Sequence, residues 1–125
     1  MQVLSNYGAQ LNLAIAQGTD FGPVTLTFTN PDTTPLNLTG CTLAAALKSQ
    51  PLGPVVEPFT MTITDPTHGV ATLFMPAATT AALTCGPSPF DVASVYQWDM
   101  KLTDASGDVS RPLWGTASVL RSITP

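Results

Sequence analysis

The chain has 125 residues, with four Lys or Arg against eight Asp or Glu and a formal net charge of −4. Its charged share of 10% lies well below the roughly 25% of ordinary soluble domains. So few cations argue against nucleic acid as a partner and against an anionic membrane surface. Outward-facing positions must therefore carry uncharged side chains, which we expect of a protein packed in an assembly. A neutral, secreted-type β domain is the alternative.

Residues 1–10, MQVLSNYGAQ, precede the first alternating run. They lack the basic start and unbroken apolar stretch of a signal peptide, so we expect synthesis and folding in a cytoplasm. The apolar runs are far shorter than the roughly 20 residues of a membrane span. Val3, Leu4 and Tyr7 have no assured place in a core. We predict that this arm contacts a partner, with an extra edge strand of the same domain as the alternative.

The first half of the chain predicts three short strands. Residues 11–16 and 24–29 alternate apolar with small or polar side chains, the period-two pattern of a half-buried strand. Residues 42–48, TLAAALK, favour a helix by propensity. Their flanks leave room for only about two helical turns, and apolar side chains alternate from Leu43 to Leu47. We therefore predict a strand there.

A hairpin and a short helix follow. Residues 59–64 and 70–75 alternate in the same way and are separated by DPTHG, a turn that holds the single histidine, His68. PAATTAAL, residues 76–83, starts with proline at a position typical of the first helical turn. We predict one or two helical turns for it.

The last hairpin joins residues 95–103 to a run that begins at Val109, through the turn residues DASGD. Asp104 and Asp108 flank the Ser-Gly of that turn and are expected to form it. Pro112 and Gly115 weaken a central-strand interpretation, so the last strand is predicted to be an edge strand or to carry a bulge.

The two tryptophans both belong to this hairpin. Trp98 shares a face with Tyr96 and Met100, which predicts that it is in the core. Trp114 either lies opposite Trp98 in the core or faces outward as an interface anchor of the type enriched at protein contacts.

About seven short strands at regular spacing predict an all-β fold, an antiparallel immunoglobulin-like β-sandwich with one short helical insertion. A partly open barrel is the alternative. Residues 11–125 are expected to form a single sandwich domain, with residues 1–10 as the arm.

The sequence predicts no catalytic, cofactor or metal site. His68 lies in a turn, and no Gly-x-Ser-x-Gly elbow accompanies it. One histidine and two distant cysteines, Cys41 and Cys85, cannot fill a zinc site, and we expect these cysteines to be small apolar residues rather than a disulfide. Asp99 and Asp91 could form an acid–base pair, but Asp99 is better explained by an ion pair with Arg111 across the hairpin. We therefore expect no enzyme activity.

The last hairpin carries an ordered set of residue types, Tyr-x-(Trp/Tyr)-Asp-(aliphatic)-x-(aliphatic), then Thr-Asp-x-x-Gly-x-(Val/Thr)-x-Arg, then Leu-x-x-Gly-x-x-x-Val. The matching positions are Tyr96, Trp98, Asp99, Met100, Leu102, Thr103, Asp104, Gly107, Val109, Arg111, Leu113 or Trp114, Gly115 and Val119, followed by Ile123 and Thr124. This set resembles the C-terminal half of small β-sandwich proteins encoded among the virion genes of tailed bacteriophages. LNLAIAQGTDFGPVTLTF, PLNLTGCTLAAALK and GVATLFMPAATTAAL resemble their earlier segments in order. The third strand departs from the Arg-bearing version frequent in that family and carries only Lys48, near its end.

The resemblance implies a virion structural protein that links other virion subunits in a tail, baseplate or fibre, with capsid decoration as an alternative location. Its implied partners are other virion proteins, and a symmetric homo-oligomer would bury the uncharged surface. The candidate interface residues are Val3, Leu4, Tyr7 and Trp114. A further alternative is a free carbohydrate- or receptor-binding module, which an exposed cluster of polar residues around Trp114 or Tyr7 would favour.

Overall fold

A computed structural model describes residues 8–49, 55–85 and 93–122. In chain order its elements are β1 (Ala9–Gln10), β2 (Leu13–Ala16), β3 (Phe21–Thr27), β4 (Thr42–Lys48), β5 (Val55–Pro58), β6 (Thr60–Asp65), the 3-10 turn η1 (Pro66–His68), β7 (Val70–Met75), α1 (Ala77–Ala81), β8 (Ala93–Thr103) and β9 (Val109–Leu120). None of the described helices is long and apolar enough to cross a membrane.

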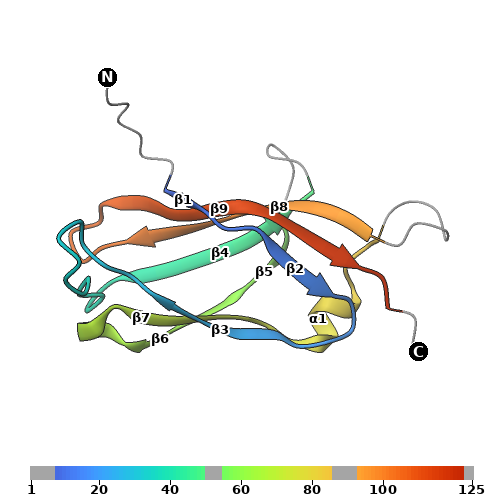
Figure 1. The fold of residues 1–125 in the computed structure, drawn as a ribbon, viewed down its shortest axis with the longest axis horizontal. Helices are drawn as coiled ribbons and strands as arrows, with labels where there is room; N and C mark the ends of the chain where they lie inside the picture. The colour runs from blue at the N-terminus through green and yellow to red at the C-terminus, as the bar shows by residue number, and fades with distance from the viewer. Residues whose placement is uncertain (1–7, 50–54, 86–92, 123–125) are drawn as a thin grey trace, which may run out of the picture.

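The strands form two sheets that pack face to face (Figure 1). The six-stranded sheet has the order β1-β9-β8-β4-β5, with β2 also paired to β9, and the three-stranded sheet has the order β3-β7-β6. β1 and β2 run parallel to β9, and the other neighbours are antiparallel. The predicted all-β sandwich with one short helical insertion is confirmed, and the barrel alternative is wrong. The predicted antiparallel pairing holds except where β1 and β2 pair with β9.

One predicted detail needs correction. β9 is not an edge strand, because β8 pairs with one side of it and β1 and β2 pair with the other. The alternative of a bulge is confirmed: Met100 pairs with Leu113 and Leu102 with Ser110, so β9 has one residue more than β8 between these pairs. Pro112 lies in this bulge, where the loss of a ladder hydrogen bond is tolerated. At Ala9–Gln10 the alternative of an extra edge strand is confirmed, because β1 lies at the edge of the six-stranded sheet. The sequence pattern missed β5.

The core lies between the sheets and is built by the strict alternation of β8. Tyr96, Trp98 and Met100 are buried, with Trp98 only 3% exposed, as predicted. The Trp98 indole packs edge-on against Phe59, with ring centroids 5.9 Å apart, and its Nε1–H donates to the Leu11 carbonyl at 2.8 Å. That bond satisfies the polar atom of the indole within an apolar core.

α1 closes one end of the sandwich beside the loop between β2 and β3 (Figure 1). Thr80 is fully buried; its hydroxyl donates to the Thr19 carbonyl at 2.7 Å and accepts from the Gly18 amide at 3.1 Å. The Asp20 carboxylate accepts from the Ala77 amide at 2.8 Å at the start of the helix. These bonds tie the short helix, which would be unstable alone, to the loop that leads into β3.

The turn between β8 and β9 forms as the sequence predicts. The Asp104 carboxylate accepts from the backbone amides of Ser106 and Asp108, both at 2.9 Å. Gly107 adopts φ +91° in the same turn, a backbone conformation that favours glycine. The hairpin therefore has a well-defined turn, and the register of β8 with β9 follows from it.

Both cysteines are free, as expected. Cys85 is buried in the main core and Cys41 is half-buried against a smaller apolar cluster around Leu38. His68 is exposed in its turn, with its Nδ1 at 2.9 Å from an oxygen of the Asp65 carboxylate.

Candidate functional site

The sequence-predicted interface residues fall into two groups. Val3, Leu4 and Tyr7 lie outside the described residues. Trp114 lies on the outer face of the six-stranded sheet and is half-buried, so it faces outward and the core alternative is wrong; its role as an interface anchor stays a prediction. It pairs with Asp99, while Trp98 pairs with Gly115.

The side-chain alternation of β9 explains the orientation of Trp114. Gly115, Ala117 and Val119 are buried and face the core. Neighbouring positions point to the opposite face of a strand, so Trp114 and Thr116 point outward. The same alternation in β8 places Trp98 inward and its neighbours Gln97 and Asp99 outward.

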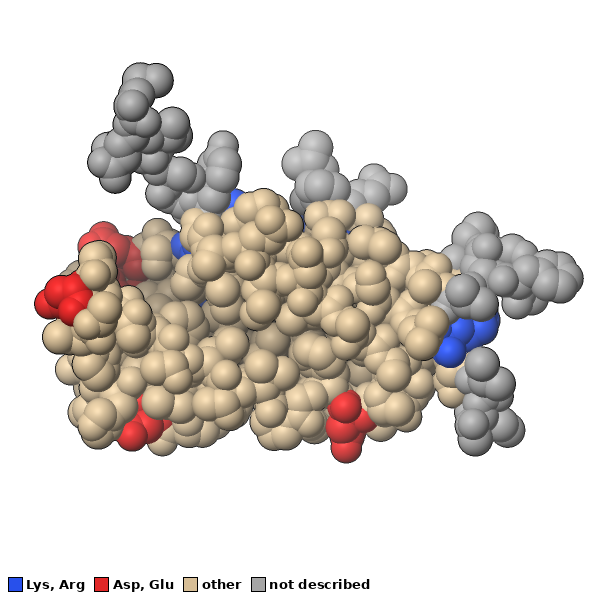
Figure 2. All heavy atoms as spheres, viewed as in Figure 1, with Lys and Arg blue, Asp and Glu red and all other residues tan. Residues whose placement is uncertain are grey.

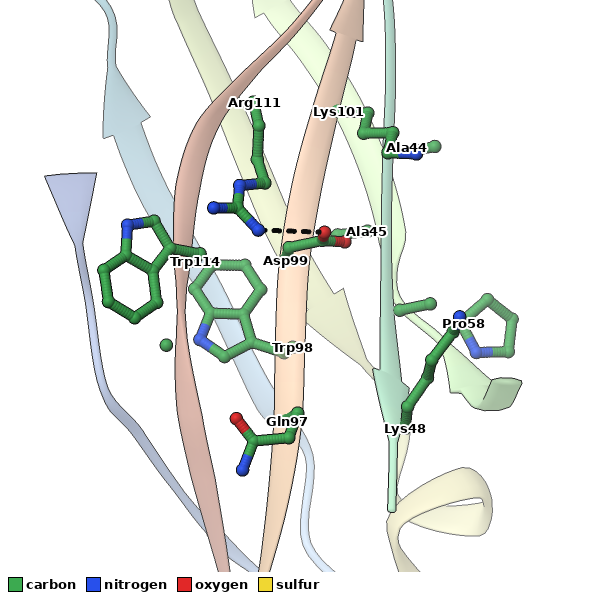
Figure 3. A pocket seen from close by; sticks show the side chains of 12 residues that line it. Ala44, Ala45, Lys48, Pro58, Gln97, Trp98, Asp99, Lys101, Arg111 and Trp114 are labelled. Atoms are coloured by element: carbon green, nitrogen blue, oxygen red, sulfur yellow. Dashed lines mark ion pairs between the residues drawn. The ribbon is translucent and has the colours of Figure 1, made fainter. Parts of the chain in front are cut away.

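Trp114 borders a groove of about 630 Å³ on the outer face of β4, β8 and β9 (Figure 3). The hydrogen-bonding register aligns Ala46, Asp99 and Trp114 in one row across these three strands. Ala44 and Ala46 carry only a methyl group each, whereas larger side chains rise around them. We call this feature the sheet groove and define it by Lys48, Ala46, Asp99, Lys101, Arg111 and Trp114.

Arg111 contacts both the Trp114 ring and the Asp99 carboxylate in the sheet groove. Its guanidinium carbon lies 5.7 Å from the centroid of the Trp114 ring, and its Nη1 lies 3.8 Å from a carboxylate oxygen of Asp99. The predicted Asp99–Arg111 pair is therefore confirmed. Because both side chains are about 40% exposed, the pair contributes at most about 1 kcal/mol to stability and serves mainly to orient Arg111.

The Trp114 indole is held from a second side as well. Its Nε1–H donates to the Gly8 carbonyl at 3.3 Å, just before β1. The ring is therefore positioned by the guanidinium of Arg111 and by the backbone of the first strand. A large aromatic surface held in this way is suited to binding, because little side-chain entropy remains to be lost.

Charge is distributed unevenly between the sheet groove and the rest of the chain. Three of the four cations, Lys48, Lys101 and Arg111, line the groove together with one acid, Asp99. The groove therefore carries a formal charge of +2 although the chain carries −4, which leaves −6 on the remaining sequence. Sequence reasoning missed this cluster, since it is the pairing of β4, β8 and β9 that brings the three cations to one face. Lys101 lies across from Ala44 and beside Arg111, and Lys48 lies four residues further along β4, across from Gln97. The signal for this cluster in the sequence was the alternation that places Asp99, Lys101 and Trp114 on the outward face of their strands.

The Asp65–His68 pair is a weaker candidate. Its hydrogen bond holds the pKa of the Asp65 carboxyl below the ordinary value of 3.8. Both side chains are well exposed on a turn, and Thr67 adds a hydroxyl 3.3 Å from the same carboxylate. Nowhere in residues 8–49, 55–85 and 93–122 do three or more His, Cys, Asp or Glu side chains gather as metal ligands would.

No protein-family model matches the chain, and no curated protein matches it. Among solved structures, a family 123 glycoside hydrolase from Clostridium perfringens, studied for glycolipid glycan hydrolysis, is similar at 13% identity and a TM-score of 0.35. The matched region covers 93% of this chain and 24% of that chain, so this chain spans about a quarter of the enzyme's length. A similarity this weak has no bearing on function.

Proposed function

We propose that the chain is a non-enzymatic structural protein of a bacteriophage virion, an assembly module that links other virion subunits in a tail, baseplate or fibre. Capsid decoration is the alternative location. The proposal rests on the sequence resemblance and on one structural observation, an exposed apolar area on the outer face of the six-stranded sheet.

This area, the aliphatic patch, consists of outward side chains at the ends of three paired strands. They are Ala14 and Ala16 of β2, Leu120 of β9, and Ala93 and Val95 of β8. Val95 is 58% exposed and Leu120 is 56% exposed. The uncharged Ser118 lies among these side chains, between Ala14 and Val95. Exposed apolar side chains gathered on a sheet face are typical of contact surfaces, and the patch offers a symmetric oligomer an area that needs no charged partner.

The low charge of the surface supports the same proposal. Figure 2 shows one broad side of the molecule on which charged atoms lie at the margins and the middle is uncharged. Solitary soluble domains usually intersperse many charges of both signs over their surface. A subunit that is covered by neighbours has no such need, because interface cores are depleted of charged residues.

The decisive experiment is quantitative peptide mass spectrometry on purified particles of the virus that encodes the chain. We expect the protein in the particle, at a few to a few dozen copies if it belongs to the tail and at hundreds if it decorates the capsid. Absence of the protein from the particle would contradict the virion proposal.

A paired substitution tests the contact surface. Val95→Lys with Leu120→Lys is expected to abolish incorporation into particles, because it places two charges in the aliphatic patch. Val109→Lys is the control, since Val109 is 62% exposed and lies outside the patch. Equal incorporation of both variants would show that the patch is not the contact.

The second candidate function is a carbohydrate- or receptor-binding module. The observation that favours it is the sheet groove, where the half-buried Trp114 is surrounded by polar and charged side chains. Aromatic rings beside hydrogen-bonding groups are a common arrangement in small-ligand sites.

A further inference from the structure

We propose that the sheet groove binds an acidic oligosaccharide, with a sugar ring against Trp114 and the carboxylate or sulfate groups of its rings near Lys101 and Arg111 at one end of the groove and near Lys48 at the other (Figure 3). The inference names the ligand class of the second candidate function and rests on that candidate, whereas it is independent of the virion proposal.

The first argument is charge complementarity. Most of the chain's positive charge borders one groove, on a protein whose remaining residues are strongly acidic. Lys101 is exposed and Lys48 is half-buried, so both ammonium groups can reach a ligand. Acidic residues elsewhere repel an anion in solution, which leaves the groove as the favourable place for it to bind.

The second argument concerns the shape and the apolar lining of the groove. Its volume of about 630 Å³ lies within the roughly 300–1,000 Å³ of small-molecule sites. Ala44, Ala46 and Pro58 contribute apolar lining from β4 and β5, and Trp114 lies on the opposite side of the groove (Figure 3). The C–H face of a sugar ring can pack on such a surface while its edge remains polar.

The third argument concerns why the ligand is an acidic sugar rather than another kind of anion. Asp99 lies in the middle row of the groove, between Ala46 and Trp114, so a dense polyanion would be repelled there. A carboxylate accepts hydrogen bonds from hydroxyl groups, and the exposed Gln97 amide both donates and accepts. A ligand with one anionic group per ring and hydroxyls beside it fits both requirements, whereas an acidic peptide or a nucleic acid does not.

The experiment is an NMR titration of the full 15N-labelled chain with trigalacturonic acid and sialyllactose, and with the neutral maltotriose and lactose. We expect the acidic sugars to shift the indole N–H signal of Trp114. The indole N–H signal of Trp98 should not move, because this group is hydrogen-bonded to the Leu11 carbonyl in the core. Neutral sugars are expected to bind at least about tenfold more weakly, because charge-assisted hydrogen bonds are lost. Added salt is expected to weaken the binding of the acidic sugars but not that of the neutral sugars.

Matched variants locate the site. Lys101→Gln and Thr62→Glu each lower the net charge by one, but Thr62 lies exposed on β6 of the opposite sheet. We expect Lys101→Gln to weaken binding of the acidic sugar about threefold to tenfold and Thr62→Glu to leave it nearly unchanged. Trp114→Ala is expected to weaken it at least about tenfold, and far-ultraviolet circular dichroism checks that each variant is folded.

Several results would overturn the inference. No binding of either acidic sugar at millimolar concentration would do so, and so would binding that both groove variants leave intact. Equal affinity for neutral sugars would remove the acidic ligand class but retain the second candidate function. Concentration-dependent shifts of the groove signals without sugar would instead assign the groove to a second copy of the chain.

Discussion

Glycine residues at two turns show how differently the same substitution can act at the scale of a single residue. Gly69 and Gly107 both have positive φ, +69° and +91°. A Cβ at Gly69 would lie 2.5 Å from the Phe28 carbonyl oxygen and 2.7 Å from that of Leu36, whereas one at Gly107 meets nothing within 4 Å. Gly69 therefore permits a close approach of backbone segments, while Gly107 serves only the turn conformation.

We expect Gly107→Ala to lower the free energy of unfolding by about 1 kcal/mol through backbone strain alone. Gly69→Ala carries the same strain plus the overlap with two carbonyls, for a total of about 3 kcal/mol. Urea unfolding followed by tryptophan fluorescence measures both. Equal losses would mean that the loop around Phe28 and Leu36 moves away without cost.

The Asp65–His68 pair predicts part of the pH dependence of stability. Its hydrogen bond lowers the pKa of Asp65 below 3.8 in the folded chain. The unfolded chain therefore binds more protons in acid, so the pair stabilises the fold above the unfolded pKa and loses its contribution as pH falls through the folded pKa.

We expect Asp65→Asn to reduce the fall in melting temperature between about pH 6 and about pH 2.5, because the titrating carboxylate is gone. His68→Ala removes the partner and should reduce the same fall, and the double variant should add little. Thermal unfolding at both pH values gives the comparison. An unchanged pH dependence in Asp65→Asn would contradict this role for the pair.

At the scale of elements, α1 depends on tertiary bonds because five residues cannot sustain a helix in water. The Thr80 hydroxyl provides the central bonds, to Thr19 and Gly18 of the β2–β3 loop. Helix and loop are therefore expected to unfold together.

Thr80→Val keeps the side-chain shape but leaves the Gly18 N–H and the Thr19 carbonyl without their buried partner. We expect a loss of about 3 kcal/mol in the free energy of unfolding. Thr79→Val, on the same helix but half-buried, should cost less than about 0.5 kcal/mol. Hydrogen exchange of the Gly18 amide provides a local readout, which should accelerate in Thr80→Val alone.

An element could be predicted from the sequence when the pattern that produces it lies within that element, and not when it depends on a distant strand. Period-two alternation is present in the sequence of β8 itself, so that strand and the inward Trp98 were predicted. β1 has two residues and no period of its own; it exists because β9 pairs with it. β9 was misjudged as a possible edge for the same reason, since its second partner lies about a hundred residues earlier in the chain. The sheet groove depends on the same long-range register and was missed.

At the scale of the whole molecule, charge is segregated rather than mixed. Cations gather over the sheet groove at one part of the outer sheet face, and the aliphatic patch occupies the strand ends of the same face. The virion assignment and the ligand class both remain predictions. They use different parts of this face, so one can fail while the other stands.

The parallel pairing of β2 with β9 has a mechanical consequence. Parallel strands place the start of β2 and the end of β9 at opposite ends of the ladder, which includes the Leu11 amide to the Trp114 carbonyl and the Gln17 amide to the Leu120 carbonyl. Tension applied before β1 and after β9 therefore loads these bonds in shear, all at once. Tension applied at the paired residues Ala93 and Leu120 instead peels β8 from β9 one bond at a time. Force spectroscopy should find a higher rupture force in the first geometry, and equal forces would refute this. A domain built in this way is expected to resist a pull along its length better than one across its final hairpin.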